Sequence, residues 1–329
     1  MATLLVAAAG GHLEELWQLR PRLVPAAEAT VTWVTSDTAQ SRTLLAGEQR
    51  LFAPPARPRD AGATVANLRF ARHVLALDRW TDIVSTGPLM AVPFMALGRA
   101  QGIRCHFIES PARVVGPSLS AKILERIPGV QCYSPYPWWR RPSWVHRGSV
   151  LDGYEPAPAA APGVQRVVVT VGTSSYGFAR LVERLVEIIP PEWEVFWQTG
   201  STDVRGLGID GRPFVGEREL SDQLAAADLV IAHAGVGSAL AAMRAGRAPL
   251  LVPRRAARGE HVDDHQVQIA GELEQRGLAL SCEVGALDLA TLERAAGRRV
   301  TRSAQPPRFR LERRRSAAPQ VLAGRRASA

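Results

Sequence analysis

Short apolar runs alternate along this chain with longer segments in which apolar residues recur every three or four positions. The runs are TLLVAAA (3–9), ATVTWVTS (29–36), TDIVSTG (81–87) and IRCHFIES (103–110), then VQRVVVTVG (164–172), WEVFWQTG (193–200), DLVIAHAG (228–235), APLLVPR (248–254) and LALSC (278–282). Runs with little polar interruption suit strands covered on both faces, and the segments between them, of about 10 to 15 residues, suit helices. The pattern predicts βαβ units and parallel sheets.

The alternation is interrupted once, at LDGYEPAPAAAPG (151–163), which is rich in proline and alanine. A chain of 329 residues also exceeds the usual size of one domain. We therefore predict an α/β protein with two Rossmann-like, doubly wound parallel-sheet domains facing a cleft. The expected boundaries are 1–150 for the first domain, 151–163 for a linker, 164–296 for the second domain and 297–329 for a tail.

The net charge of +9 comes from that tail. From Arg298 onward there are ten arginines and one acid, Glu312, which leaves 30 basic and 30 acidic residues elsewhere. The domains are thus close to neutral, and we expect no nucleic-acid partner. The tail mixes Pro, Ser, Ala and Arg, which predicts disorder. It is either a solvated extension or an electrostatic attachment to an anionic membrane surface, at about 1 kcal/mol per arginine.

Other features concern the compartment. The three cysteines, Cys105, Cys132 and Cys282, form no C-x-x-C pair, which is typical of a reducing compartment. The apolar stretch at the N-terminus is too short for a signal sequence, and no run approaches the 18 or so apolar residues of a membrane span. We expect a cytoplasmic protein, soluble or attached peripherally to the inner face of the cell membrane.

Three strand-to-helix turns are rich in glycine: AAAGGHLEEL (7–16), VTVGTSSYGFARL (169–181) and AHAGVGSALAAM (232–243). Ligands of parallel sheets bind beyond the carboxyl ends of the strands, where glycine lets backbone amides and a helix N-terminus approach a diphosphate. Gly235, Gly237 and Ser238 are therefore a candidate phosphate cradle, although tight turns also serve packing alone. The P-loop pattern G-x-x-x-x-G-K-[ST] is absent, and no G-x-G-x-x-G follows the first strand, which disfavours nucleotide hydrolysis and dinucleotide redox chemistry.

The segment GEHVDDHQ (259–266) concentrates two histidines, two aspartates and a glutamine before an expected helix. A metal site is one interpretation, but the aspartates also suit a helix N-cap and no third histidine lies nearby, so we expect no metal. Recognition of sugar hydroxyls explains these side chains better. The neighbouring Arg254, Arg255 and Arg258 favour an acidic sugar.

These strings together resemble the C-terminal, sugar-nucleotide-binding domain of family-28 glycosyltransferases. Upstream, AAAGGHLEEL and FIESPARVVGPSLSAKIL (107–124) resemble the acceptor subunit of the two-subunit bacterial polysaccharide and dolichol-linked enzymes. The resemblance implies a fusion of both subunits with the GT-B fold. It also implies inverting, metal-independent and cofactor-free transfer from a UDP-sugar, usually to a polyprenyl-diphosphate-linked saccharide in polysaccharide synthesis.

The resemblance also implies the residues of the site. For the donor they are Gly172, Thr173, Val215, Gly216, His233, Gly235, Gly237, Ser238, Glu260, His261, Asp264, His265 and Gln266. On the acceptor side they are Gly10, Gly11, His12 and Arg113. The chain departs from a related peptidoglycan transferase at Ala241, where that enzyme has a ribose-binding glutamate. Glu260 or Asp264 is the expected replacement.

An inverting transfer needs a base for the acceptor hydroxyl. His12 is the first candidate, because imidazole titrates near neutrality, and Glu109 is the second. The structural alternatives are a histidine bonded to its loop backbone and a Glu109–Arg113 ion pair four residues apart. PLMAVPFMALGRA (88–100) and YPWWRRPSW (136–144) are candidate membrane contacts, or else ordinary packing elements.

Three other functions remain open. A UDP-sugar 2-epimerase shares the two-domain fold but has no acceptor. A natural-product glycosyltransferase carries a similar H-x-G-x-G-[ST] string but is expected to have a larger acceptor domain. A non-catalytic sugar-nucleotide-binding module is the third.

Overall fold

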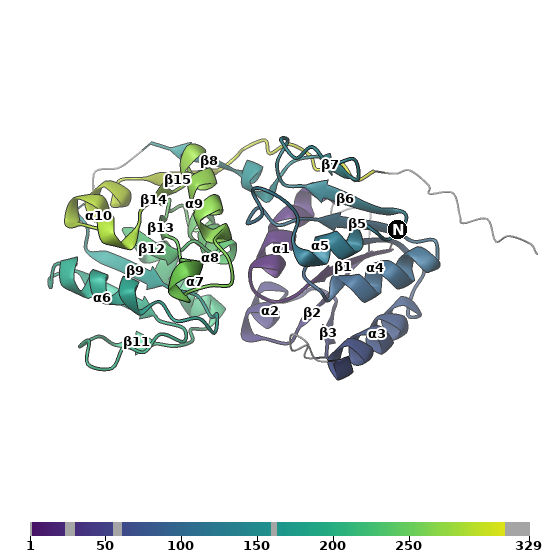
Figure 1. Ribbon diagram of the computed structural model, residues 1–329, viewed down its shortest axis with the longest axis horizontal. Helices are drawn as coiled ribbons and strands as arrows, with labels where there is room; N and C mark the ends of the chain where they lie inside the picture. The colour runs from purple at the N-terminus through teal and green to yellow at the C-terminus, as the bar shows by residue number, and fades with distance from the viewer. Residues whose placement is uncertain (1, 24–29, 55–60, 159–162, 313–329) are drawn as a thin grey trace, which may run out of the picture.

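The computed structural model describes residues 2–23, 30–54, 61–158 and 163–312, which form two parallel sheets flanked by helices (Figure 1). The N-terminal sheet has the order β3 (Arg50–Ala53), β2 (Thr30–Ser36), β1 (Ala2–Ala7), β4 (Trp80–Gly87), β5 (Arg104–Ile108), β6 (Val130–Ser134), β7 (Trp144–His146). The C-terminal sheet has the order β11 (Gly211–Arg212), β10 (Glu194–Gln198), β9 (Arg166–Thr170), β12 (Leu229–His233), β13 (Leu250–Val252), β14 (Leu280–Ser281). The prediction of two doubly wound α/β domains is confirmed.

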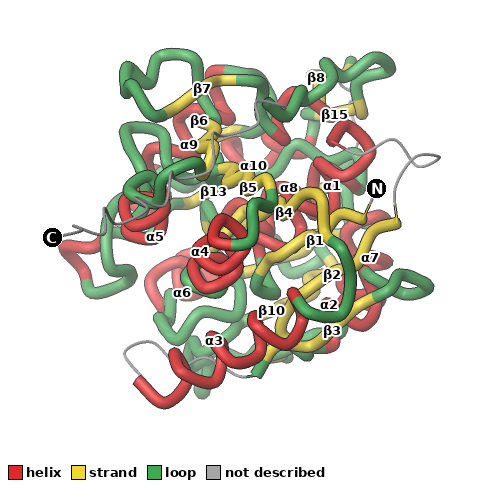
Figure 2. Tube along the Cα trace, turned by 90° about the vertical axis from the view of Figure 1, so that its right-hand side faces the viewer, coloured by secondary structure: helices red, strands yellow, loops and turns green. Residues whose placement is uncertain are grey.

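Alternating strand residues of the N-terminal sheet enter two separate cores. Leu4 and Val6 of β1 pack with α3, α4 and α5, whereas Leu5 and Ala7 pack on the other face with α1. Figures 1 and 2 show α3 and α4 along the outer face of this domain. The helices are α1 (Gly11–Leu23), α2 (Ala39–Leu44), α3 (Ala61–Leu75), α4 (Ala91–Ala100) and α5 (Leu119–Leu124). Phe94 and Met95 of α4 are fully buried, so segment 88–100 is a packing helix.

The C-terminal sheet is covered in the same way. Val167 and Val169 of β9 pack with α6 and α10, whereas Val168 packs with α7 and α8. The helices are α6 (Ala179–Ile188), α7 (Glu217–Ala226), α8 (Val236–Arg244), α9 (His265–Gln275) and α10 (Leu289–Ala296), with short 3-10 turns η1 (Val150–Gly153), η2 (Ala256–Arg258) and η3 (Val284–Ala286). None of the helices in the described ranges is both long and apolar enough to cross a membrane.

A single apolar core joins the two domains. Leu16 and Leu19 of α1 belong to the same buried cluster as Leu240 and Met243 of α8 and Leu273 of α9. Figure 1 shows α1 on the side of its domain that faces α8 and α9. Burial of these apolar side chains stabilises the docking of one domain on the other.

Residues 297–312 are ordered, which corrects the prediction that the tail is disordered from 297. β15 (Arg299–Arg302) pairs antiparallel with β8 (Tyr154–Ala157). The chain then returns to the N-terminal domain, where Phe309 is 2% exposed and packs edge-on against Tyr133. Composition predicted disorder because it averages over the segment and gives no weight to one residue, Phe309, that is buried. The remainder, 313–329, lies outside the described residues, as does the membrane attachment expected of it.

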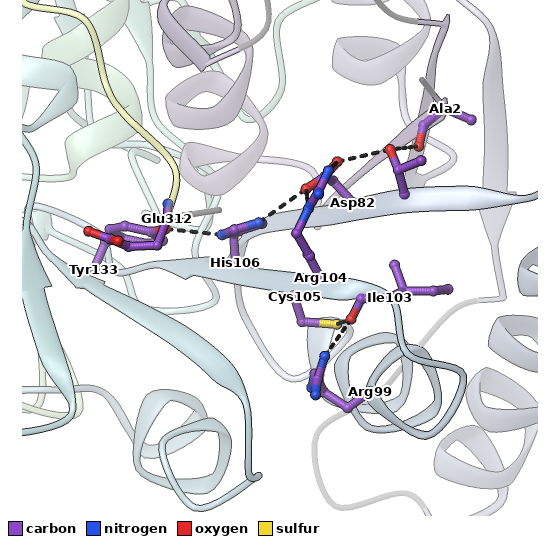
Figure 3. Close-up of polar contacts among 10 residues, drawn as sticks. Ala2, Asp82, Arg99, Ile103, Arg104, Cys105, His106, Tyr133 and Glu312 are labelled. Atoms are coloured by element: carbon purple, nitrogen blue, oxygen red, sulfur yellow. Dashed lines mark hydrogen bonds and ion pairs between the residues drawn. The ribbon is translucent and has the colours of Figure 1, made fainter. Parts of the chain in front are cut away.

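A polar network on the N-terminal domain binds Glu312, at the end of this segment (Figure 3). The Tyr133 hydroxyl accepts from the backbone N–H of Glu312 at 2.7 Å and lies 3.0 Å from Nδ1 of His106. Asp82 accepts two hydrogen bonds from Arg104, at 2.7 and 2.6 Å. Asp82 lies on β4, Arg104 and His106 on β5 and Tyr133 on β6. None of these side chains lines the cleft between the domains, so the network anchors the return segment and does not contact the site.

Candidate functional site

The loops at the carboxyl ends of both sheets line one cleft of about 520 Å³ between the domains. All three glycine-rich turns contribute to it, as the sequence analysis expected of them. Gly11 and Gly237 lie back to back: a Cβ built on Gly237 would lie 3.0 Å from Cα of Gly11. Because α1 begins at Gly11 and α8 at Val236, the N-termini of two helices from different domains converge in the cleft.

Most of the predicted donor and acceptor residues line the cleft. They are Gly10, Gly11, His12, Gly172, Thr173, Val215, His233, Gly235, Gly237, Ser238, His261, His265 and Gln266. The predicted residues outside the lining are Glu109, Arg113, Gly216, Glu260 and Asp264. Position in the sequence could not predict which residues line the cleft, because several residues outside the lining are direct neighbours of residues within it.

His233 ends β12 and explains two of the glycines. Its ring lies against both Gly172 and Gly235, so that a Cβ at either position would overlap it. Nδ1 of His233 donates to the carbonyl of Thr170 at 3.4 Å. Burial, with Arg254 nearby, lowers the pKa of His233 to about 3. The ring is therefore neutral at pH 7, and both turns need glycine here for space.

His12 lies in the first turn of α1, half-buried in the cleft lining. Its Nδ1 is covered and has no hydrogen-bond partner within the described part of the chain. Burial, opposed by a hydrogen bond to the Thr86 backbone and assisted by the charge of Arg113, lowers the pKa of His12 to about 4. A neutral imidazole with a free ring nitrogen can accept a proton.

Glu109 is buried away from the lining, and it holds a loop. Its carboxylate accepts from the backbone N–H of Ser110 at 3.1 Å and of Ser118 at 2.8 Å, and Ser118 caps α5. The ion pair with Arg113, which was the structural alternative for Glu109, is not formed: Arg113 pairs with Asp263 of the other domain at 2.9 Å. The segment 109–118 is thereby tied to both domains.

Glu15, which the sequence analysis missed, lines the cleft on this side, as does the neighbouring Glu14. It accepts a hydrogen bond of 2.6 Å from the hydroxyl of Ser110. Burial, opposed by the Ser110 bond and assisted by the charge of Glu109, raises the pKa of Glu15 to about 8. Glu15 is therefore largely protonated at pH 7. The sequence did contain one signal for Glu15: it lies three residues after His12 in an expected helix, and residues at this spacing share a helix face.

The segment 259–266 divides its side chains between the cleft and the protein. Glu260 binds Arg180 through two hydrogen bonds of 3.0 and 3.1 Å, and Asp264 accepts from the backbone of Ala256. Neither expected replacement for the ribose-binding glutamate therefore reaches the cleft. Glu217, at the start of α7, does line it.

His261, Asp263 and His265 bring one ligand atom each to within 4.8 Å of one another. Asp263 is shared, however, between the ring of His265 and the guanidinium of Arg113. These hydrogen bonds keep the pKa of the Asp263 carboxyl far below its usual value despite burial. The carboxylate thus already has a cationic partner.

Further residues in or beside the cleft lining had no sequence signal. Gln40, at the start of α2, bonds both the N–H and the carbonyl of Gly10, at 2.6 and 3.3 Å. Arg244 of α8 bonds Glu217 at 2.8 Å and pairs with Glu14 of α1 at 3.3 Å, which ties the two domains beside the cleft. These contacts join residues far apart in the chain, so no local pattern marks them.

Residues 166–315 match the family model of the glycosyltransferase family 28 C-terminal domain. No curated protein sequence matches the chain. Among solved structures, Acinetobacter baumannii MurG is 20% identical with a TM-score of 0.54, covering 89% of this chain and 88% of its own. The kitacinnamycin glycosyltransferase is 16% identical with a TM-score of 0.56, covering 90% and 89%. Spinosyn rhamnosyltransferase SpnG, complexed with thymidine diphosphate, is 18% identical with a TM-score of 0.50, covering 85% and 86%.

These likenesses extend over both domains and show the same two-domain fold. The family model in turn covers the domain that supplies His233 and the Gly235–Ser238 turn. The second domain therefore matches a glycosyltransferase family 28 C-terminal domain, and the two domains together have the GT-B fold of a glycosyltransferase.

Proposed function

We propose that the protein transfers a sugar from a UDP-sugar, with inversion and without a metal ion, to a hydroxyl of a polyprenyl-diphosphate-linked saccharide in polysaccharide synthesis. One observation carries the proposal: the acceptor-side turn with His12 and the donor-side glycine turns line the same cleft. An epimerase or a simple binding module has no use for a second, acceptor-side group of residues there.

The donor side suits a nucleoside diphosphate. The amides at the start of α8 and the turn at Gly172 offer main-chain N–H groups to a diphosphate, and the helix N-terminus adds about half a positive charge. Phe214 and Val215 line the cleft beside them and offer an apolar contact to a pyrimidine base. Glu217 supplies a carboxylate for the ribose hydroxyls in the place of the missing glutamate.

His12 is the base in this proposal. The acceptor oxygen bonds to the anomeric carbon as the bond from that carbon to the diphosphate oxygen breaks. The hydroxyl proton passes to a ring nitrogen of His12, and the electron pair leaves with UDP. Main-chain amides at the glycine turns stabilise the charge that builds on the diphosphate. Glu15 holds its proton at pH 7 and Glu109 lies outside the lining, so neither competes for this role.

Metal independence is supported by the charges around the histidine cluster. Asp263 is paired with Arg113. Burial lowers the pKa of His261, and the charges of Arg254 and Arg113 add to this effect. A divalent cation in this cluster would have to displace or approach these guanidinium groups. The leaving diphosphate can instead be stabilised by amides and by arginine.

A lipid-linked acceptor is supported by a surface next to the cleft. Val115 is 77% exposed, Leu119 72% and Trp138 48%, and Trp138 donates to the carbonyl of Val114. Lys122 of α5 adds a positive charge to this surface. Exposed apolar residues beside tryptophan and a cation suit the interface of an anionic membrane, which is consistent with peripheral attachment at the cytoplasmic face.

The test is thermal stabilisation of the purified protein by UDP, UDP-glucose, UDP-N-acetylglucosamine, UDP-glucuronate, thymidine diphosphate and NAD, with and without EDTA. A ligand at about a hundred times its Kd adds about 2.7 kcal/mol. We expect UDP and at least one UDP-sugar to raise Tm equally with and without the chelator. Stabilisation by NAD alone, or loss of the effect in EDTA, would contradict the donor or the metal-free part of the proposal.

A further inference from the structure

Arg254 lies at the floor of the cleft and is 1% exposed. It follows β13, and β12 separates β13 from β9 in the sheet. Its side chain nevertheless reaches the turn after β9, where Nη2 donates to the carbonyls of Val171 and Tyr176 at 2.8 and 2.9 Å. The guanidinium thus crosses the end of the central strand β12 and holds both ends of the glycine-rich turn after β9.

The rest of the guanidinium is unsatisfied. Nε and Nη1 are buried and have no hydrogen-bond partner among the described residues. One face of the group lies 5.4 Å from the centre of the Phe178 ring, which is a weak contact for a charge removed from water. Burial lowers the pKa of Arg254 to about 10, so the side chain is still charged at pH 7.

Neighbouring acids do not neutralise this charge. Glu260 acts on Arg254 electrostatically, but its two oxygens are bonded to Arg180. No ion pair joins Arg254 to a carboxylate in the ranges that the structure describes, whereas the adjacent Arg255 pairs with Glu283 at 2.7 Å. A buried cation without a counter-ion is strongly unfavourable, so such a group is typical of a site whose anion arrives with the ligand.

The surroundings of Arg254 are those of the donor. The backbone N–H of Arg254 donates to Gln266 at 3.0 Å, and Gln266, His233 and Thr173 line the same cleft. A nucleotide sugar offers two anionic groups to this position, the diphosphate and, in a uronic acid donor, the sugar carboxylate. Arginine is the side chain best suited to either.

We propose that Arg254 binds an anionic group of the nucleotide-sugar donor through its free Nε and Nη1, and so couples donor binding to the turn at 172–176. Because both nitrogens are covered by protein, this turn shifts when the donor enters. The inference rests on the proposed function, since it assumes a nucleotide sugar in the cleft. Of the three arginines around 254–258 that favour an acidic sugar, the structure assigns the contact to this one.

The experiment measures Kd by calorimetry for uridine, UDP, UDP-glucose and UDP-glucuronate with the wild type, Arg254→Gln, Arg254→Lys and the control Arg255→Gln. Arg255 is the matched control because its side chain points to Glu283. We expect Arg254→Gln to change the Kd of uridine by no more than about threefold. We expect the same substitution to raise the Kd of the ligand that carries the bound anionic group at least tenfold. Arg254→Lys keeps the charge, and we expect it to lie between the two.

The arms separate the sources of the anion. A tenfold or larger loss for UDP relative to uridine assigns the contact to the diphosphate. The same loss confined to UDP-glucuronate relative to UDP-glucose assigns it to a sugar carboxylate and names a uronic acid donor. Unchanged affinities for all ligands, or an equal loss that includes uridine, would overturn the proposal, because Arg254 would then only hold the turn. If the wild type binds none of the uridine compounds, the proposed function itself fails.

Discussion

At the scale of single residues, the site depends on protonation states that burial imposes. His12 and Glu15 lie three residues apart on α1 and both line the cleft. Burial favours the neutral form of each, so the imidazole has lost its proton at pH 7 and the carboxyl has kept its own. One turn of helix therefore presents a proton acceptor and a hydrogen-bond donor to the cleft.

His12→Ala tests this assignment. We expect the transfer rate kcat to fall by about 10² to 10⁴, the usual contribution of a general base, with the Kd of UDP unchanged. Since the pKa of His12 is lowered to about 4, the base is lost only below that pH, and the acid limb of kcat/KM in the wild type should lie near pH 4. Rates of UDP release across pH 4 to 8 measure both effects.

The exposed His73, on α3 and outside the cleft lining, provides the control. His73→Ala should match the wild type in rate and in pH profile. Full transfer activity in His12→Ala would exclude the imidazole as the base. An acid limb near pH 6.5 would instead indicate a histidine whose pKa burial has not changed.

At the scale of elements, the site depends on the close approach of two helix N-termini. The backbones of Gly11 and Gly237 touch where α1 and α8 begin. Substitution of a helical glycine by alanine ordinarily gains about 1 kcal/mol. At Gly237 the new Cβ would lie 3.0 Å from Cα of Gly11, so the two helices must separate.

We expect Gly237→Ala to lower kcat/KM at least tenfold and to lower the free energy of unfolding by about 1–3 kcal/mol, the usual cost of overpacking. Gly271→Ala on α9 is the matched control, because a Cβ there meets nothing within 4 Å. That variant should be as active as the wild type and equally or more stable. Urea unfolding and initial rates give both quantities; wild-type behaviour of Gly237→Ala would show that the contact is not needed.

At the scale of the whole molecule, the two domains are held by one core and by the returning C-terminal segment. Phe309 belongs to the core cluster that contains α1, α8 and α9, and Arg22 donates to the carbonyl of Pro307 at 2.7 Å. The segment that follows β15 therefore starts in the C-terminal domain and packs against the N-terminal domain. This segment thus ties the two domains together.

Phe309→Ala should destabilise the protein by about 3–5 kcal/mol, the usual cost of truncating a buried phenylalanine. We expect the loss to appear as a lower Tm and a weaker coupling of the domains, seen as faster proteolysis between them. Arg310→Ala, at an exposed neighbouring position, is the control and should leave Tm unchanged. Equal Tm values for the two variants would contradict a structural role of the return segment.

The sequence by itself determined the α/β class, the two domains and the glycine turns, because strand and helix periodicity and turn chemistry are local properties. It also brought most of the donor residues together, since parallel strands place their carboxyl ends at one edge. Only the tertiary structure decided which polar residues face the cleft. Arg113 lies four residues from Glu109 but pairs with Asp263, 150 positions away. Contacts between residues distant in the chain likewise decide the place of Glu15 in the cleft, the lack of a counter-ion for Arg254 and the order of 297–312. Burial then shifts the pKa values of Glu15 and Arg254.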